Sequence, residues 1–276
     1  MRNIFFALFL MMTVTCDVMA QYVGLDDSVR FRIGYATTFM REYGQKSGCD
    51  EMTILDIGSR KSVFYSVKNN RSYELIDSMH RNGISPHAYI DIVSQHGYKG
   101  PRITYYVLKD HSSVNSLTYY SSCSSMFQSE ENMTSLPWSF ADGDTIVCGY
   151  PCKKAMMSYR GREWTAWYAL DIPVSEGPWK LRGLPGLILC AYESEGVFRF
   201  DCNGISNGNG EEMRMVDVKT IKCTPEKMIE MERMLVEDPD VLYGLIHGQR
   251  TYTFDKDGKL MDYSDKKACL KERKID

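Results

Sequence analysis

A predicted strand at residues 163–170 carries a large aromatic side chain on both of its faces. Successive side chains of a strand point to opposite faces, so Trp164 and Tyr168 share one face while Trp167 lies on the other. A sheet with one wet face seldom places a tryptophan there, so the strand is either covered on both sides or lines a groove that accepts an apolar group. We favour coverage of Trp167 by a loop of the protein itself, and we expect the segment that follows the strand to supply it.

Short runs rich in β-branched and aromatic residues dominate the rest of the chain, which predicts a β-rich fold. Turn residues separate the clearest runs, at residues 142–144, 160–162 and 256–258. The other predicted strands are residues 52–57, 62–67, 102–108, 116–120, 145–150, 153–159, 251–254 and 259–263. No internal repeat or long linker interrupts them, so we expect a single domain over residues 21–276. Its fold should be a predominantly antiparallel, curved β-sheet or half-barrel with one or two covering helices.

Helical periodicity is clear in two segments. Thr224 is suited to be an N-cap because Pro225 follows at the first helical position, and methionines at helical spacing continue until Pro239, where the helix should stop. We interpret these methionines as core-filling side chains. A second, weaker helix covers residues 72–81.

The segment after the aromatic strand is rich in proline and glycine. Pro173 should end the strand, because proline has no N–H to donate. Further along, Pro185 and Gly186 fit the two central positions of a type II turn, the second of which requires a positive φ. We therefore expect a tight turn that leads into an apolar strand.

That apolar strand begins at Leu187 and should pair with residues 197–202 across a two-residue loop at residues 194–195. The register places Leu189 on one core-like face with Phe200. It also directs Cys190 and Cys202 to opposite faces, so we expect no disulfide between these two cysteines.

The N-terminus is typical of a secretory signal peptide, with Arg2, an apolar run and a small-residue site that ends at Ala20. A membrane-spanning helix needs about 20 apolar residues, and this run is shorter. Lipidation at Cys16 is disfavoured, because Thr15 stands where lipid-modified proteins usually carry a small residue. We expect cleavage after Ala20, removal of residues 1–20, and a protein of the periplasm or cell surface without a transmembrane helix.

Charge and cysteine content narrow the function further. The net charge is −3, and the basic cluster at residues 266–274 is interrupted by acids, so we expect a solvated tail there and no nucleic-acid partner. Eight of the nine cysteines remain after signal removal, which in an oxidising compartment favours disulfides. If Cys148 and Cys152 lie on one extended strand, their Cα atoms are about 13 Å apart, too far for a mutual bridge.

No sequence pattern supports a metal site or a cofactor, and we expect neither. Residues 204–208 match the Gly-x-Ser-x-Gly pattern around Ser206, but no helix follows, as the nucleophile elbow requires. Cys152 could serve a Cys-His hydrolase only with an unspecified histidine. We expect a non-enzymatic binding protein for a peptide or another apolar ligand, with an exported hydrolase as an alternative. The candidate ligand-binding residues are the central aromatics Tyr150, Trp167, Tyr168 and Trp179.

The central part of the chain resembles the GLPGLI family, exported proteins abundant in Bacteroidetes. The matching positions are Gly149, Cys152, Ala155, Ile172, Pro173, Gly177, Pro178, Gly183, Leu184, Pro185, Gly186, Leu187 and Ile188. Members resemble envelope proteins encoded near TonB-dependent transporters, which implies an accessory role in uptake or peptide handling and an outer-membrane transporter or envelope protein as partner. A structural partner of an outer-membrane complex is a further alternative. None of the last six residues can titrate, attack or bind a metal, so we interpret the motif as structural.

Overall fold

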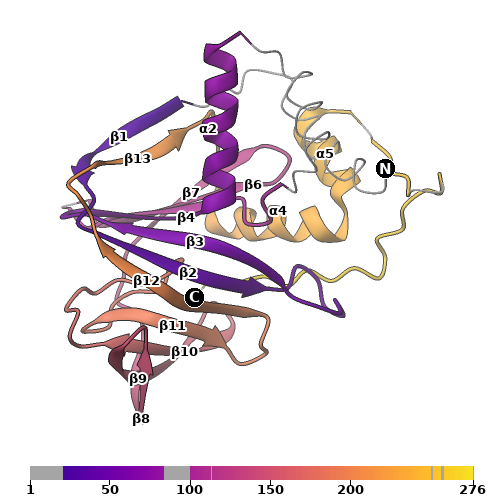
Figure 1. The fold of residues 1–276 in the computed structure, drawn as a ribbon. Coiled ribbons are helices and arrows are strands. Elements are labelled where there is room, and N and C mark those ends of the chain that lie inside the picture. Colours follow the sequence, from indigo (N-terminus) through magenta and orange to yellow (C-terminus); the bar gives the residue numbers. More distant parts are fainter. Residues whose placement is uncertain (1–20, 84–99, 113, 250, 256–257, 276) are drawn as a thin grey trace.

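Antiparallel strands dominate the architecture of the computed structural model, which describes residues 21–83, 100–112, 114–249, 251–255 and 258–275 (Figure 1). The predicted signal peptide therefore lies outside the described residues. Twelve strands form one sheet in the order β14-β7-β6-β5-β4-β3-β2-β12-β11-β10-β9-β8, and β1 and β13 form a separate two-stranded sheet. The strands are β1 Gln21–Ser28, β2 Phe31–Phe39, β3 Cys49–Ile57, β4 Lys61–Ser66, β5 Tyr105–Asp110, β6 Ser116–Ser122, β7 Met126–Asn132, β8 Ser139–Val147, β9 Tyr150–Tyr159, β10 Arg162–Ala169, β11 Leu187–Glu193, β12 Phe198–Asn207, β13 Glu212–Asp217 and β14 Ile221–Lys222.

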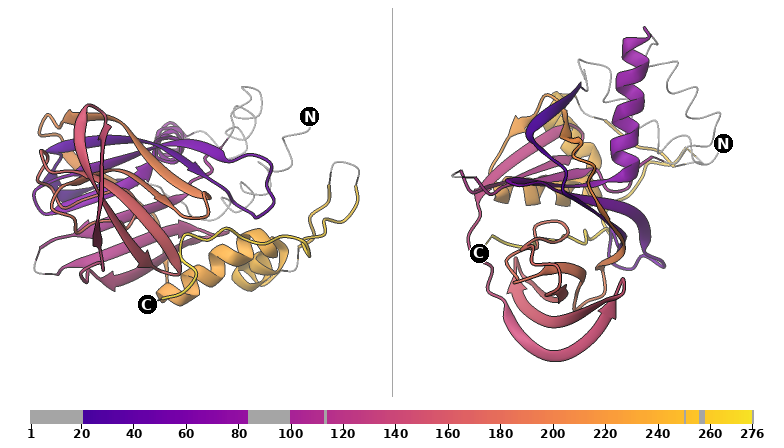
Figure 2. Two further views of the ribbon diagram at one scale, coloured as in Figure 1. Left: turned by 90° about the horizontal axis from the view of Figure 1, so that it is seen from below. Right: turned by 60° about the vertical axis from the view of Figure 1, so that its left-hand side comes forward.

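The large sheet curls without closing into a barrel (Figure 2). Its concave face holds the main core, where aromatic side chains from distant strands meet. Phe200 of β12 lies 5.9 Å from Phe64 of β4 and 6.3 Å from Trp164 of β10, measured between ring centroids. The predicted curved antiparallel sheet with a few helices is thus confirmed, and most of the strands expected from the sequence are present.

Both faces of β10 are largely covered, as the distribution of its aromatics predicted. Trp164 is fully buried on the concave face, and Trp167 on the other face is partly buried. The long loop between β10 and β11 fills the concave side, because its Trp179 packs against Trp164 at 5.5 Å. The loop therefore covers the Trp164 face, and the expectation that it covers Trp167 is wrong. Trp167 lies near Gly143 of β8 instead.

The expected type II turn at Pro185-Gly186 is wrong. Gly186 does not have a positive φ; Gly183 does, at 91°. Gly186 is required for a different reason: a Cβ built there would lie 2.1 Å from the carbonyl oxygen of Ala169. The motif is therefore a place where the loop crosses the end of β10 at backbone contact distance before β11 begins.

Other family positions also serve close packing. A Cβ on Gly177 would lie 2.8 Å from a methyl group of Ile188, and the side chains of Leu184, Leu187 and Ile188 are buried in the main core. Cys152 and Ala155 of β9 are buried in the same core. At these positions the loop packs closely against strands β9–β11. This packing is what a structural interpretation of the motif expects.

A hairpin turn was placed incorrectly before residues 145–150. Residues 142–144 interrupt β8 as a bulge, and the chain reverses instead at Cys148-Gly149, whose φ angles are 49° and 82°. Cys148 and Cys152 are therefore not on one extended strand. The hairpin expected at residues 251–263 is present in a reduced form, without extended strands. An antiparallel bridge joins Phe254 to Leu260. On either side of it, the N–H groups of Asp255 and Met261 donate to the carbonyls of Lys259 and Thr253.

The pairing of β11 with β12 has the predicted faces but a register that differs by two residues. Ala191 pairs with Phe200, and Cys190 pairs with Asp201, because the connecting loop is longer than two residues. Cys190 and Cys202 form no disulfide in the structure.

Three helices occur among the described residues, α2 Val67–Arg81, α4 Pro225–Glu237 and α5 Pro239–His247. The Thr224 side chain caps α4 as predicted, and Met228 and Met231 are buried in the main core. Pro239 ends α4 but also begins α5, because Asp238 caps the new helix. A second, smaller core lies where β1, β13 and α2 pack on the outer face of the large sheet (Figure 1).

The predicted solvated tail is wrong for residues 269–272, although Lys267, Arg273 and Lys274 are exposed. The N–H of Cys269 donates to the carbonyl of Arg41, and Leu270 and Glu272 are buried. Arg162 of β10 donates from Nε to the carbonyl of Leu270 at 2.6 Å. Charge patterning alone missed this, because Lys271 lies against the rings of Tyr105 and Phe198, which come from distant strands.

Candidate functional site

The four aromatics selected from the sequence do not meet on one surface. Trp179 is fully buried, and Tyr168 is buried beside Phe140 at 6.2 Å between ring centroids. Trp167 and Tyr150 are partly buried, and the Lys154 ammonium lies 5.9 Å from the Trp167 ring. None of the four lines either of the two cavities described below.

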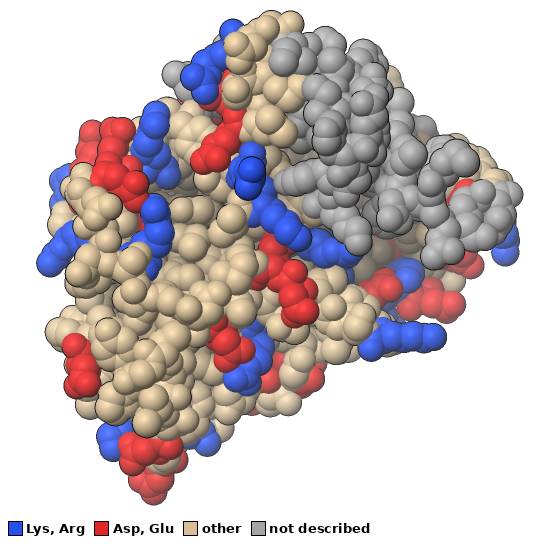
Figure 3. All heavy atoms as spheres, viewed as in Figure 1, with Lys and Arg blue, Asp and Glu red and all other residues tan. Residues whose placement is uncertain are grey.

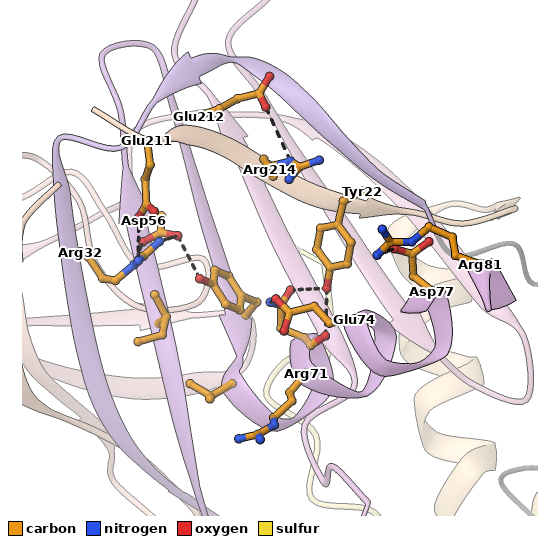
Figure 4. Close-up of a pocket in the computed structure, with 14 residues that line it drawn as sticks. Tyr22, Arg32, Asp56, Arg71, Glu74, Asp77, Arg81, Glu211, Glu212 and Arg214 are labelled. Atoms are coloured by element: carbon orange, nitrogen blue, oxygen red, sulfur yellow. Dashed lines mark hydrogen bonds and ion pairs between the residues drawn. The ribbon is translucent and has the colours of Figure 1, made fainter. Parts of the chain in front are cut away.

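The larger cavity is an open groove of about 1170 Å³ on the outer face of the large sheet (Figure 4). Its walls are the two-stranded β1–β13 sheet, helix α2 and strands β2–β4, segments that are far apart in the sequence. The lining residues are Tyr22, Arg32, Ile54, Asp56, Tyr65, Val67, Asn70, Arg71, Glu74, Asp77, Arg81, Glu211, Glu212 and Arg214.

One end of the groove is organised by Arg32. Its guanidinium binds Asp56 in a bidentate manner, with Nε–Oδ1 and Nη2–Oδ2 distances of 2.6 and 2.9 Å, and its Nη1 lies 2.7 Å from Glu211. The Tyr65 hydroxyl donates to Asp56 at 2.9 Å. Burial and the nearby Asp56 carboxylate raise the pKa of Tyr65 well above its ordinary value. Tyr65 therefore stays a neutral donor at any physiological pH.

The α2 side of the groove presents a row of polar groups. The Tyr22 hydroxyl donates to Asn70 at 2.9 Å, and the Asn70 amide donates to Glu74 at 3.0 Å. Burial and the Glu74 carboxylate raise the pKa of Tyr22 above its ordinary range. One helical turn further on, Arg81 pairs with Asp77 at 2.9 Å.

Arg71 differs from the other three arginines of the groove, which each form an ion pair with a described carboxylate. It is exposed, and no carboxylate of the described residues lies within ion-pair distance of it. In the close-up its side chain extends away from Tyr22 and Glu74 (Figure 4). A ligand carboxylate can therefore approach Arg71 without first breaking an existing pair.

The lining of the groove is rich in charged side chains of both signs. It contains four arginines and five carboxylates, so both signs are offered to a ligand, and acidic and basic side chains are also interspersed on the face shown in Figure 3. Among the described lining residues there is no serine, threonine, cysteine or histidine.

The two nucleophiles considered for a hydrolase lie elsewhere. Ser206 is exposed on β12, and its hydroxyl donates to the backbone carbonyl of Arg32 at 3.4 Å. Cys152 is buried and donates to the carbonyl of Tyr150, and burial raises the pKa of its thiol. In the described part of the chain, neither residue makes a hydrogen bond to a histidine or a carboxylate.

The sequence reasoning missed the groove, although one signal was available. Arg71, Glu74, Asp77 and Arg81 recur every three or four residues, which places them on one face of α2. This charged stripe lies beside the apolar side of Tyr73 and Ile76, which packs on the second core. The partner strands β1 and β13 could not be assigned to the same site from sequence.

Two further properties concern metals and membranes. Over the described ranges, no group of three His, Cys, Asp or Glu side chains has an arrangement that could hold a metal ion. Over the same ranges, no helix has the length and apolar character needed to cross a bilayer.

Comparison with known proteins finds one family model that matches the centre of the chain. Residues 124–190 match the model of a family described as a protein of unknown function, Porph_ging, which confirms the resemblance seen in the sequence. No curated protein matches the chain. Similar solved structures include PNGF-II in a C2 and in a P21 crystal form, each 13% identical, with TM-scores of 0.49 and 0.48. Each alignment covers 74% of this chain and 33% of PNGF-II, so the chain spans about a third of that protein's length.

Proposed function

We propose that this chain, whose residues 124–190 carry the Porph_ging family segment, is an exported cell-envelope protein that binds an extended polar peptide in the groove between β1–β13 and α2. The observation that carries the proposal is the lining itself, a volume of about 1170 Å³ with four arginines, five carboxylates and two tyrosine hydroxyls. An accessory role in TonB-dependent uptake or peptide handling is consistent with this activity.

The groove favours a peptide over an apolar ligand. Only Ile54 and Val67 contribute aliphatic side chains to the lining, and the aromatic residues of the central sheet lie outside it. A peptide carries N–H and C=O groups along its whole length, together with charged side chains and termini. Both signs of charge in the groove can therefore be matched, and specificity would come from the spacing of these charges.

Peptide capture provides the test. Immobilised protein comprising residues 21–276 is incubated with a tryptic digest of serum albumin, and retained peptides are identified by mass spectrometry. Retained peptides should be enriched in sequences with both acidic and basic residues. The Arg71→Glu variant should bind the retained peptides roughly 10-fold more weakly, a loss of about 1.4 kcal/mol.

The matched control is Arg199→Glu, because Arg199 is also exposed but lies on β12 outside the groove. This variant should bind as the wild type does. Retention of apolar compounds in place of peptides, or equal weakening by both substitutions, would contradict the peptide proposal.

Export predicts a specific disulfide. All eight cysteines of the described chain are free in the structure, and the Cys148 thiol lies 2.9 Å from the carbonyl oxygen of Cys202. Burial and a hydrogen bond with the Cys148 thiol raise the pKa of Cys202 to about 12. We propose that this pair is bridged when the protein is secreted, which would attach the β8–β9 turn to β12.

Two readouts check the export proposal. Protein secreted from its own signal sequence should begin at Gln21, and peptide mapping without reduction should recover Cys148 linked to Cys202. A Cys190→Ser variant should keep that link. Intracellular retention with an intact N-terminus would refute export, whatever the result of peptide capture.

A second candidate function is that of a structural partner in an outer-membrane complex. Strand β8 is an edge of the large sheet, and its side chains Phe140 and Ile146 are 69% and 73% exposed. Exposed edge strands pair readily with another chain. Affinity purification of the tagged protein from the envelope distinguishes the two: an Ile146→Lys variant should lose a co-purifying protein under this second function and keep it under the first.

A further inference from the structure

A layer of charged side chains lies inside the concave face of the large sheet, separate from the groove. Lys109 of β5 is fully buried and lies 2.5 Å from Glu176 of the β10–β11 loop. Burial lowers the pKa of Lys109, but its ammonium group also donates to the carbonyls of Gly177 and Leu181. Because three acceptors surround it, the charged form is the one that this arrangement holds.

Lys180 lies beside this pair and is also fully buried. Its Nζ lies 2.8 Å from Glu131 of β7 and 2.8 Å from Glu272 of the C-terminal segment. Burial lowers the pKa of Lys180, but the two carboxylates outweigh burial and raise it above its ordinary value. Arg160 of the β9–β10 turn pairs with the same two carboxylates.

Arg182 is the fourth buried cation of the layer. Its guanidinium donates to the carbonyl of Thr134 at 2.6 Å and to that of Lys180 at 3.3 Å. Within the described ranges, no carboxylate lies within 4.0 Å of it, whereas Lys109 has one and Arg160 and Lys180 have two each. Among the side chains named so far, four are cations and three are carboxylates, Glu131, Glu176 and Glu272.

Burying a charge without a counter-charge costs folding free energy, so we expect an anion to lie near Arg182. A cavity of about 150 Å³ lies beside it. Arg160 and Arg182, which are 7% and 8% exposed, both line this cavity, together with Glu131, Thr134 and Ser135. A water molecule occupies about 30 Å³, so the space suits a small ion and is too small for a drug-sized ligand.

We propose that this cavity binds a small oxyanion, held by the guanidinium groups of Arg182 and Arg160. Planar guanidinium groups match the geometry of carboxylate and phosphate oxygens, and hydrogen bonds to them are strong. The Thr134 and Ser135 side of the cavity provides the entry, because both residues are exposed. The bound anion would neutralise the charge that the protein's own carboxylates leave uncompensated.

Thermal unfolding of the protein in chloride, phosphate and acetate at equal ionic strength tests the site. Phosphate or acetate should raise the melting temperature in a saturable manner, by about 5 °C at 100 times the dissociation constant. Isothermal titration with the same anions should give one site. A response to acetate alone assigns a carboxylate ligand, and a response to phosphate assigns a phosphate.

Variants at the entry and at the cation make the test specific. Ser135→Glu places a carboxylate where the anion would lie, so it should raise the melting temperature in chloride and abolish the response to added anion. The matched neutral variant, Ser135→Gln, should keep the response. Arg182→Gln should lose it as well, and if that variant does not fold, the Ser135 pair still decides the matter.

Two results would overturn the inference. The first is the absence of a saturable effect of either anion relative to chloride. The second is an unchanged anion response in Ser135→Glu, which would place the binding elsewhere. Since this cavity and the groove share no lining residue, neither result bears on peptide capture.

Discussion

Two arginine–glutamate ion pairs have nearly the same length, but one lies inside the sheet and the other lies in the outer groove. Arg162 and Glu193 lie 2.8 Å apart, with side chains 1% and 0% exposed. Arg32 and Glu211 lie 2.7 Å apart, with side chains 38% and 51% exposed. The inner pair has no water to replace a lost partner, while the outer pair exchanges partners with solvent. The two pairs therefore have different roles despite their equal lengths. The buried pair stabilises the fold, whereas the exposed pair is available to a ligand.

The largest expected effect comes from breaking the inner pair. Glu193→Gln should destabilise the protein by roughly 3 kcal/mol, because the buried Arg162 loses its closest carboxylate. The matched outer variant, Glu211→Gln, should change the free energy of unfolding by less than about 1 kcal/mol. Urea unfolding of both variants measures the difference. Equal losses would show that exposure does not govern these pairs.

The pH dependence of stability should also originate inside the sheet. Burial raises the pKa of Glu176, but Lys109 and His111 outweigh burial and lower it to about 2 from an ordinary 4.5. Since the folded pKa is depressed, the stabilisation is complete above about pH 4.5 and is lost as the pH falls toward 2. Unfolding free energies measured across this window should decline by at most about 3 kcal/mol from this group.

The control for that decline is Glu176→Gln. This variant starts from a lower stability, because Lys109 loses its carboxylate, but its stability should change less between pH 4.5 and 2. A slope identical to that of the wild type would assign the acid sensitivity to other groups.

A smaller effect is expected where the inner loop crosses β10. Gly186→Ala should cost about 1 to 3 kcal/mol, because the new methyl group would collide with the carbonyl of Ala169. Gly204→Ala is the matched control on β12, since a Cβ there meets no atom within 4 Å. Differential scanning calorimetry of both variants should show a clear loss for Gly186 alone. A comparable loss at Gly204 would point to strand propensity as the cause.

The smallest effect should come from the groove cation. Arg71→Ala should change stability by no more than about 0.5 kcal/mol, because Arg71 is exposed and has no ion pair with a described carboxylate. Chemical denaturation measures this value. A loss above about 1 kcal/mol would mean that Arg71 is structural, and its use as a binding probe would then need revision.

Local patterns predicted much of the fold because they act over a few residues. The turn at Arg160-Gly161, the cap at Thr224 and the alternation along β10 all follow from neighbouring side chains and backbone preferences. The turn before β9 was misplaced for the same reason. Asp142-Gly143-Asp144 has turn composition, yet long-range pairing makes it a bulge and moves the reversal to Cys148-Gly149.

The candidate site was far less predictable. Its walls come from β1, β2–β4, α2 and β13, so residues near position 22 and residues near position 214 meet only after folding. The charged stripe on α2 was visible in the sequence, but its groove partners were not. The same holds for Arg182, whose lack of a carboxylate in the described structure depends on which chain segments surround it.

The sequence by itself determined a β-rich chain with two capped or periodic helical segments and a family segment in its centre, since these depend on short-range periodicity and on exact residue matches. Tertiary structure alone decided that Gly186 is needed for backbone contact, that Cys269, Leu270 and Glu272 are buried, and which other charged residues lie inside. Close approach and desolvation arise between segments distant in the chain. No local pattern of residues encodes them.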